Sequence, residues 1–261
     1  MITPSTTSRR LGLLAPIGAI AFLVAIWEFA TRVFDIRAIA LPRPGRVFSA
    51  IIEHPGFFAR HTWVTLTEAG LGLVIGFVAA GLVASVMAHS EVVERLSWPA
   101  IIVLQSTPIV VVAPILLMWF GFGLLPKAII VALFVFVPFV TNILTGLRSV
   151  SPDLLNVAAS VDASTFQVYR RLRIPFALPD VFAAARICVS LSLVGAVISE
   201  FYGGSTSGLG YEFRRALSRI DPDIAWGCIV VLASFGIVGT FIVLSFERRI
   251  LHWHPSHRGA N

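Results

Sequence analysis

Five side chains that lie close together in the sequence have the chemistry of a recognition surface: Phe166, Tyr169, Arg170, Arg171 and Arg173. On a helix, Phe166 and Tyr169 lie near one face at i and i+3, followed by Leu172 or Arg173 at i+6 or i+7. Arg170 and Arg171 lie beside them. Aromatic and arginine side chains supply most of the binding energy at protein interfaces. The segment therefore predicts a surface that docks another protein. The alternative is an amphipathic helix that lies on anionic lipid.

Local signals around this cluster predict two short helices. Ser151 is suited to cap the first helix, and Asp162 tolerates the left-handed turn that would end it. Ser164 and Gln167 have the spacing of a capping box that begins the second helix. Pro175 is expected to stop that second helix. We therefore expect a helix–turn–helix with an aromatic and basic tip.

The composition places this segment in a membrane protein. Hydrophobic residues make up 57% of the 261 residues and charged residues only 13%, whereas soluble domains contain roughly 25% charged residues. The net charge of +6 does not indicate a nucleic-acid-binding protein, because the arginines lie in short loops and form no continuous face. Basic loops between apolar runs are typical of segments near the cytoplasm and anionic lipid.

Apolar runs long enough to cross a bilayer, about 20 residues each, divide the chain. We expect six spans, over residues 11–31, 64–88, 98–120, 126–147, 179–201 and 224–246. The first run continues too far beyond its basic start for a signal peptide and is expected to be an uncleaved span. Arginine and lysine are almost equally divided between the two sides, so the positive-inside rule leaves the orientation open. The predicted organisation is a tail with the first span over 1–35, a connector over 36–63, a core over 64–247 and a tail over 248–261. The connector is extracytoplasmic and the last tail cytoplasmic if the N-terminus lies inside.

Prolines shape two of these regions. Pro42 and Pro44 impose an extended start on the connector, after which a short amphipathic helix can form. Pro108 and Pro114 fall inside the third run, where they free backbone carbonyls that neighbours or water must satisfy. That run is either a kinked packing helix or a helix that lines a pathway.

Polar groups at membrane depth are candidates for a translocation path, or equally for helix packing. The candidates are Ser106, Thr107, Pro108, Thr141, Asn142, Ser190, Ser192, Ser199 and Glu200. Glu200 either gates the outer mouth or caps its span at the interface. Glu28, Glu68 and Arg186 are expected to be structural, with Arg186 reaching the cytoplasmic surface along its own stem. No metal site is expected at the tail histidines His252, His254 and His257, and no disulfide between Cys188 and Cys228.

The basic segment resembles the coupling loop of the membrane permeases of ATP-binding-cassette (ABC) importers. The pattern in that family is Glu-Ala-Ala, three residues, Gly, nine residues, then Ile-x-Leu-Pro. The spacing is kept here, with Asn156, Val157 and Ala158 at the first three places, Asp162 at the glycine, and Leu172-Arg173-Ile174-Pro175 at the end. "LPRPGRV", "STPIVVVAPILLMWFGFG", "SGLGY" and "FERRILHW" are similar to segments of the nitrate, sulfonate and taurine branch. The resemblance covers about residues 41 to 253.

The resemblance implies an all-α permease of about six spans in the cytoplasmic membrane of a prokaryote, with both termini inside. The coupling segment, residues 151–175, would dock a separate ABC ATPase. Its expected contact residues are Asn156, Ala158, Asp162, Ala163, Ser164, Phe166, Tyr169, Arg170, Arg171 and Pro175. ATP and Mg²⁺ would be bound by that ATPase, because the chain contains no Gly-x-x-x-x-Gly-Lys-Ser/Thr loop. A solute-binding protein and a second copy of the permease would complete the importer.

The solute implied is a small sulfonate, taurine or nitrate, with riboflavin or a pyrimidine precursor of thiamine as the alternative. A secondary transporter that needs no ATPase is the alternative from another class. Such a transporter would normally have a carboxylate deep in the membrane, interrupted helices or an inverted repeat. A structural or assembly protein of the membrane is the third possibility, and it leaves the spacing of the coupling segment unexplained.

Overall fold

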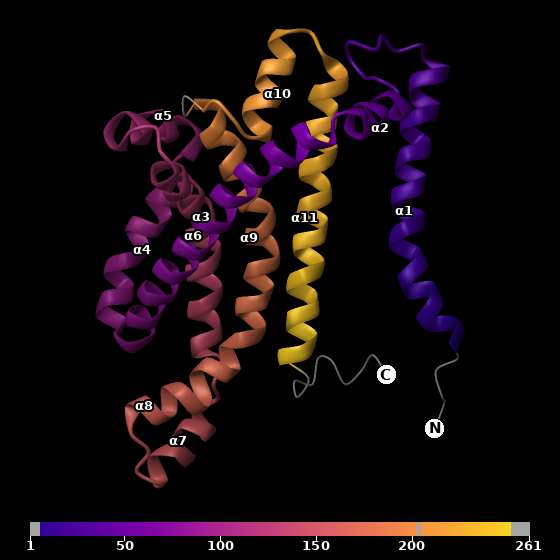
Figure 1. Cartoon of the computed structure of the whole chain (residues 1–261). Helices are drawn as coiled ribbons and strands as arrows, with labels where there is room; N and C mark the ends of the chain where they lie inside the picture. Colours follow the sequence, from indigo (N-terminus) through magenta and orange to yellow (C-terminus); the bar gives the residue numbers. More distant parts are fainter. Residues whose placement is uncertain (1–5, 203–204, 252–261) are drawn as a thin grey trace.

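The computed structural model describes residues 6–202 and 205–251, and the described chain is helical (Figure 1). The helices before the coupling segment are α1 Thr6–Val33, α2 Pro44–Glu53, α3 Pro55–His89, α4 Glu91–Ser106, α5 Ile109–Phe120 and α6 Leu124–Arg148. The coupling segment contains α7 Pro152–Ser160, α8 Thr165–Val168 and a π-helical turn, η1, Tyr169–Arg173. The last helices are α9 Ile174–Tyr202, α10 Leu209–Ser218 and α11 Pro222–Ile250.

Four helices in the described part of the chain are long and apolar enough to cross a membrane. They are α3, α6, the continuous helix Thr165–Tyr202 and α11. A fifth span is possible if α4 and α5 are counted together, although these two helices meet at a bend of 98°. The expected span over 98–120 is therefore broken between Ser106 and Ile109 into α4 and α5, a strong form of the kink that its prolines predicted. Thr107 and Pro108 have extended backbone at the bend, because a proline disfavours helical conformation in the residue before it.

The connector between α1 and α3 is shorter than the sequence indicated. The predicted amphipathic helix forms as α2, and its buried side chains include Pro44 and Val47. Residues 55–63, however, belong to α3, which starts at Pro55 rather than near residue 64. Proline is well suited to the first turn of a helix, where its missing N–H has no partner to lose. The earlier start moves Glu68 about three and a half turns into the helix.

The core is formed by α3, α6 and α9, with α6 between the other two. Small residues allow the backbones to approach closely, as is usual where helices pack within membranes. A Cβ on Gly72 of α3 would lie 2.6 Å from the carbonyl oxygen of Ala128 on α6. A Cβ on Gly146 of α6 would lie 2.7 Å from the Cα of Ala177 on α9. Both helix crossings therefore require glycine.

Different elements lie at the two ends of the helix bundle. Figure 1 shows the coupling segment projecting at one end, at the side where α1 begins and α11 finishes. The helices α2 and α10 lie at the opposite end. This places the start of α1 and the end of α11 on the cytoplasmic side if the coupling segment faces the cytoplasm, as the resemblance implies.

The second helix of the coupling segment does not stop at Pro175, and this corrects the prediction. It continues through η1 into α9, so the span expected over 179–201 begins at the coupling segment. In η1 the amide of Ile174 donates to the carbonyl of Tyr169, five residues back. The wider turn gives the ring of Pro175 room that a regular helical turn would not provide. The coupling segment and the fifth span are consequently one continuous helix.

The glycine crossing of α3 and α6 gives a matched test. Gly72→Ala should lower the free energy of unfolding by about 1–3 kcal/mol, because the new methyl group overpacks the contact with α6. Gly70→Ala, two residues away where a Cβ meets nothing within 4 Å, should be neutral or stabilising by up to about 1 kcal/mol. Thermal unfolding in detergent micelles measures both. Equal effects of the two substitutions would contradict the close crossing.

Candidate functional site

The turn of the coupling segment is set by local hydrogen bonds that the sequence predicted. The Ser151 hydroxyl accepts from the amide of Leu154 and caps α7. Ser164 and Gln167 form both hydrogen bonds of a capping box at the start of α8. Both helix starts are therefore confirmed.

Asp162 ends the first helix in the left-handed conformation, with φ at 48°. Its amide donates to the carbonyl of Ala159 at 3.1 Å, and the amide of Ala163 donates to the carbonyl of Ala158 at 3.0 Å. This pair of bonds is the Schellman ending of a helix, whose left-handed position is usually glycine. Asp162 thus takes the turn that glycine takes in the family pattern, as predicted.

The coupling segment presents Phe166 among charged side chains, and Val157 and Val161 are also exposed on its first helix. Phe166 is 71% exposed. It borders a hollow of about 560 Å³ that is also lined by Thr165, Tyr169, Arg170 and Ile174. Other predicted contact residues that are exposed or half-buried are Asn156, Ala158, Asp162, Ala163, Ser164, Arg171 and Pro175. An exposed aromatic ring with arginines at its edge has the composition of an interface anchor.

Two members of the aromatic and basic cluster turn inward instead. The Tyr169 hydroxyl donates to the carbonyl of Ser85 at 3.4 Å, and Nη1 of Arg173 donates to the carbonyl of Ala88 at 3.0 Å. The Arg173 guanidinium also lies 5.8 Å from the centre of the Tyr169 ring. The Tyr169 ring packs in part against the core of its own chain and in part lines the hollow beside Phe166, so its role as a docking anchor stays a prediction. Phe166 remains as the exposed aromatic residue.

These inward contacts cap the end of α3. The last four carbonyls of a helix lack intrahelical partners, and cationic donors stabilise that end. Arg173 supplies a donor to Ala88, and Nη2 of Arg148 supplies one to the carbonyl of Met87 at 3.3 Å. Arg148 is held in turn by an ion pair with Glu94 of α4. Hydrogen bonds to charged donors are worth about 1.5–3 kcal/mol each, so the coupling segment and α3 are firmly joined.

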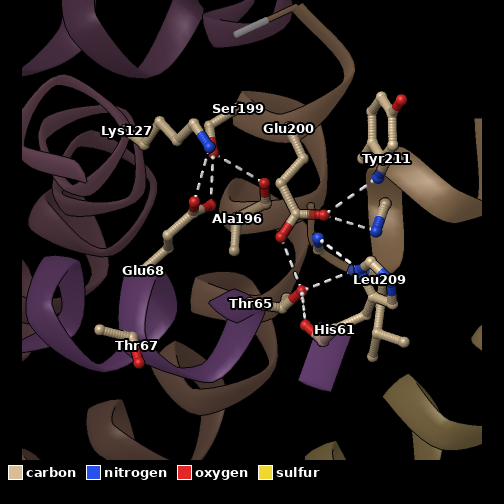
Figure 2. Close-up of polar contacts among 12 residues, drawn as sticks. His61, Thr65, Thr67, Glu68, Lys127, Ala196, Ser199, Glu200, Leu209 and Tyr211 are labelled. Atoms are coloured by element: carbon tan, nitrogen blue, oxygen red, sulfur yellow. Dashed lines mark hydrogen bonds and ion pairs between the residues drawn. The ribbon is translucent and has the colours of Figure 1, made fainter. Parts of the chain in front are cut away.

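A second group of polar contacts lies at the other end of the bundle, where it satisfies the start of α10 (Figure 2). The amide of Gly208 donates to Nδ1 of His61 at 3.1 Å, and that of Leu209 donates to Oγ1 of Thr65 at 2.8 Å. The amides of Gly210 and Tyr211 donate to Oε2 of Glu200 at 2.5 and 3.1 Å. These are the four N–H groups that the first turn of a helix leaves free. Two residues of α3 and one of α9 therefore hold α10 in place.

Glu200 is the centre of this group. Its side chain is 0% exposed, and its Oε1 lies 2.6 Å from the Thr65 hydroxyl. A carboxylate is favoured at the positive end of a helix. A Cβ on Gly208, which has a φ of 116°, would collide with the Glu200 carboxyl group. Glu200 is thus an internal acceptor in the described protomer, and its predicted role at the outer mouth or as a cap stays a prediction.

A buried ion pair lies beside it. Nζ of Lys127 on α6 is 2.7 Å from Oε1 of Glu68 on α3, and the Ser199 hydroxyl is 3.4 Å from Oε2 of Glu68. All three side chains are buried. Such a pair gains little net stability over apolar residues, but removing one partner typically costs about 3–5 kcal/mol. Glu68 is structural, as predicted, and Lys127 is the partner that the sequence did not identify.

The predicted path residues do not meet in one cavity of the described protomer. Ser106, Thr107 and Pro108 are at the bend between α4 and α5. Thr141 and Asn142 bond back to carbonyls of their own helix α6. Ser190 lines an apolar groove of about 600 Å³ between α9 and α11, which takes in none of the other predicted path residues. Ser192 and Ser199 are buried. Within this chain these residues are dispersed.

Other predictions concern the cysteines, Arg186 and the tail histidines. Cys188 and Cys228 are buried free thiols, as expected. The Arg186 guanidinium lies 3.4 Å from the carboxylate of Glu247 near the end of α11, and its reach to the cytoplasmic surface stays a prediction. Among the described residues no group of His, Cys, Asp and Glu has the arrangement of a metal site. The three tail histidines lie outside the described residues.

Sequence reasoning missed His61 and Thr65 as well as Lys127. The signal was present, since His61, Thr65 and Glu68 follow an i, i+4, i+7 spacing on one helical face. It was hidden because the helix was expected to begin at residue 64, which left His61 in the connector. Lys127 gives no such signal, since its partner is 59 positions away.

Comparison of the sequence with known proteins identifies a family and several relatives. Residues 72–252 match the family described as binding-protein-dependent transport system inner membrane component. The formylaminopyrimidine transport permease protein ThiX of Halalkalibacterium halodurans is 30% identical over 232 residues, covering 88% of this chain and 92% of the relative. The aliphatic sulfonates transport permease protein SsuC of Bacillus subtilis, a putative assignment by its own description, is 29% identical over 252 residues, covering 95% and 89%.

A solved structure supports the fold. A bacterial ABC transporter involved in the import of the acidic polysaccharide alginate contains a chain that superposes with a TM-score of 0.63. The match covers 94% of this chain and 99% of the other, at 19% sequence identity. At that identity the likeness concerns the arrangement of helices.

The left-handed turn yields a stability prediction. Asp162→Gly should leave the free energy of unfolding unchanged or raise it by up to about 1 kcal/mol, because glycine adopts a positive φ without steric cost. Asp162→Val should destabilise the protein, because a β-branched residue is strained in this conformation. Thermal unfolding of the purified permease measures both. A marked loss of stability in Asp162→Gly would show that the aspartate carboxylate has a role that its backbone geometry does not explain.

Proposed function

Because the chain belongs to the family of binding-protein-dependent transport system inner membrane components, we propose that it forms the transmembrane path of an ABC importer. ATP is hydrolysed by separate subunits that dock on the coupling segment, and a solute-binding protein delivers the solute from the opposite side. The observation that carries the proposal is the coupling segment, which projects from the bundle with Phe166 exposed at its surface. The family argues against the alternative of a secondary transporter. The buried carboxylates of Glu68 and Glu200 are engaged in contacts within the chain.

The geometry of the coupling segment suits transmission of force. Its second helix runs without interruption into α9, so a push on α8 acts directly on a membrane span. The first helix is joined to it by a turn with two backbone hydrogen bonds and a capping box. A docked ATPase therefore moves the segment as a rigid unit and switches the access of the path between the two sides.

Phe166 is the residue that most directly tests docking. Phe166→Ala should weaken binding of the ATPase by at least about 2 kcal/mol, or roughly 30-fold, because it removes the exposed aromatic anchor. Phe122→Ala serves as the control, since that ring is 66% exposed but lies outside the coupling segment. Co-purification and titration of the ATPase in nanodiscs give the affinities. Equal affinity of the Phe166 variant and the wild type would refute the docking surface.

The path itself is proposed to form between two copies of the chain. Support comes from the positions of the candidate residues, which are dispersed in the described protomer. Residues 106–108 lie at the α4–α5 bend, Thr141 and Asn142 lie on α6, and Ser190 lies in the groove between α9 and α11. A homodimer with a central path allows polar positions from both copies to face one another. Closed twofold symmetry is the commonest arrangement of soluble homo-oligomers, and it fits one docked ATPase for each coupling segment.

The solute is proposed to be a small organic molecule of the sulfonate or taurine type. The named relatives include an aliphatic sulfonate permease, and a formylaminopyrimidine permease that favours a pyrimidine as the second candidate. Lys127 and Arg186 are both paired with carboxylates, so neither offers free positive charge to a bare inorganic anion. Hydroxyl and amide groups among apolar side chains suit a zwitterion such as taurine, or the apolar tail of an alkanesulfonate, better than nitrate.

A thermal-shift screen of the cognate binding protein tests the solute. Taurine and short alkanesulfonates, or else formylaminopyrimidine and riboflavin, should raise its unfolding midpoint by several degrees. Ligand at 100 times its dissociation constant stabilises a protein by about 2.7 kcal/mol. Amino acids, sugars and metal ions are the control panel. Stabilisation by the control panel alone would overturn both candidate solutes.

A further inference from the structure

The helix α3 is joined by polar contacts to functional elements at both of its ends. Near its C-terminus, at the cytoplasmic side, it contacts the coupling segment and the end of α6. Toward its N-terminus it contacts α9 and the start of α10. Its 35 residues correspond to about 52 Å. One helix thus reaches from the proposed ATPase docking surface to the opposite end of the molecule.

We call the contacts between the coupling segment and the C-terminal end of α3 the inner joint. They are made by side chains of the coupling segment. Arg173 bonds the carbonyl of Ala88, and Tyr169 bonds that of Ser85. Ala88 lies in the last turn of α3, where its carbonyl has no intrahelical donor. Because η1 and α9 form one continuous helix, Arg173 moves with the coupling segment and carries the end of α3 with it.

The outer joint uses one hydroxyl to hold two other elements. Thr65 lies 2.6 Å from Oε1 of Glu200 on α9 and accepts from the amide of Leu209 at 2.8 Å. Thr65 and Glu200 are fully buried, so no water competes for these bonds. A shift of α3 therefore either takes the start of α10 with it or breaks a buried network, and the latter is costly.

The body of α3 is suited to carry a displacement. It has no interior proline, whereas α6 contains Pro138 and α9 contains Pro179. Prolines inside helices are common sites of kinks. The face of α3 at Gly72 and Gly76 packs closely against α6. The other two core helices are more easily bent.

We propose that α3 is the transmission element of the importer, with Arg173 and Thr65 as the positioning residues at its inner and outer joints. Movement of the coupling segment is passed through α3 to residues 205–211 and α10, at the end of the molecule that faces the binding protein. Docking of the binding protein is passed back along the same helix to the ATPase. This inference rests on the proposed function, because it requires an ATPase that moves the coupling segment.

The test uses the permease with its ATPase in nanodiscs and measures how strongly the binding protein stimulates ATP hydrolysis. Thr65→Val and Arg173→Gln should each reduce that stimulation by about fivefold or more, the lower end of typical coupling between sites. Thr65→Ser and Arg173→Lys keep a hydroxyl or a positive donor and should restore most of it. Hydrolysis without the binding protein is measured for every variant, and the stimulation is expressed as the ratio of the two rates of that same variant.

Two matched controls separate the joints from their surroundings. Thr67→Val removes a hydroxyl from α3 that bonds only the carbonyl of Trp63 on the same helix. Arg95→Gln removes an exposed arginine at the cytoplasmic side that pairs with Glu91 on its own helix. Both controls should be stimulated like the wild type. Loss of stimulation in either control, equal to that in the joint variants, would contradict the assigned roles.

The double variant Thr65→Val/Arg173→Gln decides whether the joints act in series. If both joints lie on one route, the double variant should be stimulated as little as the more impaired single variant and no less. The effects of the two substitutions are then not additive. Multiplied losses would mean two independent routes and would overturn the proposal. Wild-type stimulation in both single variants would overturn it as well. If the wild-type complex itself is not stimulated by its binding protein, the proposed function fails instead.

A labelling measurement gives a readout that does not depend on turnover. Thr206→Cys provides an exposed thiol beside α10, while the native cysteines are buried. ATP binding by the ATPase should change the rate at which a membrane-impermeant maleimide labels this thiol, and Arg173→Gln should abolish that change. A nucleotide-dependent rate that persists in Arg173→Gln would show that the signal reaches α10 without the inner joint.

Discussion

Backbone N–H groups that are buried without water must find acceptors within the protein. The structure depends on this constraint at the start of α10. Four consecutive amides are satisfied by His61, Thr65 and Glu200. Because two of these acceptors are on α3 and one is on α9, the requirement of a single helix end fixes three helices relative to one another. An unsatisfied buried amide costs about 1–3 kcal/mol, so this arrangement is strongly specified.

At the C-terminal end of α3 the same requirement applies to acceptors instead of donors. There the free groups are carbonyls, and arginines of the coupling segment and of α6 supply the donors. Between the two ends, glycines bring α3 against α6, and the Glu68–Lys127 pair crosses the same contact. Large apolar side chains remain exposed on α1, α3 and α11. That is the expected surface of a protein whose solvent is partly lipid, where burying apolar groups offers no gain.

Sequence patterns predicted features that depend on neighbouring residues, and they were less successful for contacts between distant segments. The caps at Ser151 and Ser164 and the turn at Asp162 were predicted because each depends on residues within one turn. The continuation of the helix through Pro175 was not, since the widened turn before it gives no sequence signal. The orientation of Tyr169 and the partner of Glu68 depend on residues more than 50 positions away. Only the packed structure shows them.

The central claim is that ATP hydrolysis on partner subunits drives solute through this chain, and proteoliposomes test it most directly. The permease and its ATPase are reconstituted with the loaded binding protein inside and ATP outside, so that the solute moves outward from the lumen to the nucleotide side. We predict transport that requires both ATP and the binding protein and persists when ionophores have collapsed every ion gradient. Transport that proceeds without ATP and stops when the gradients are collapsed would contradict the account and identify a secondary transporter.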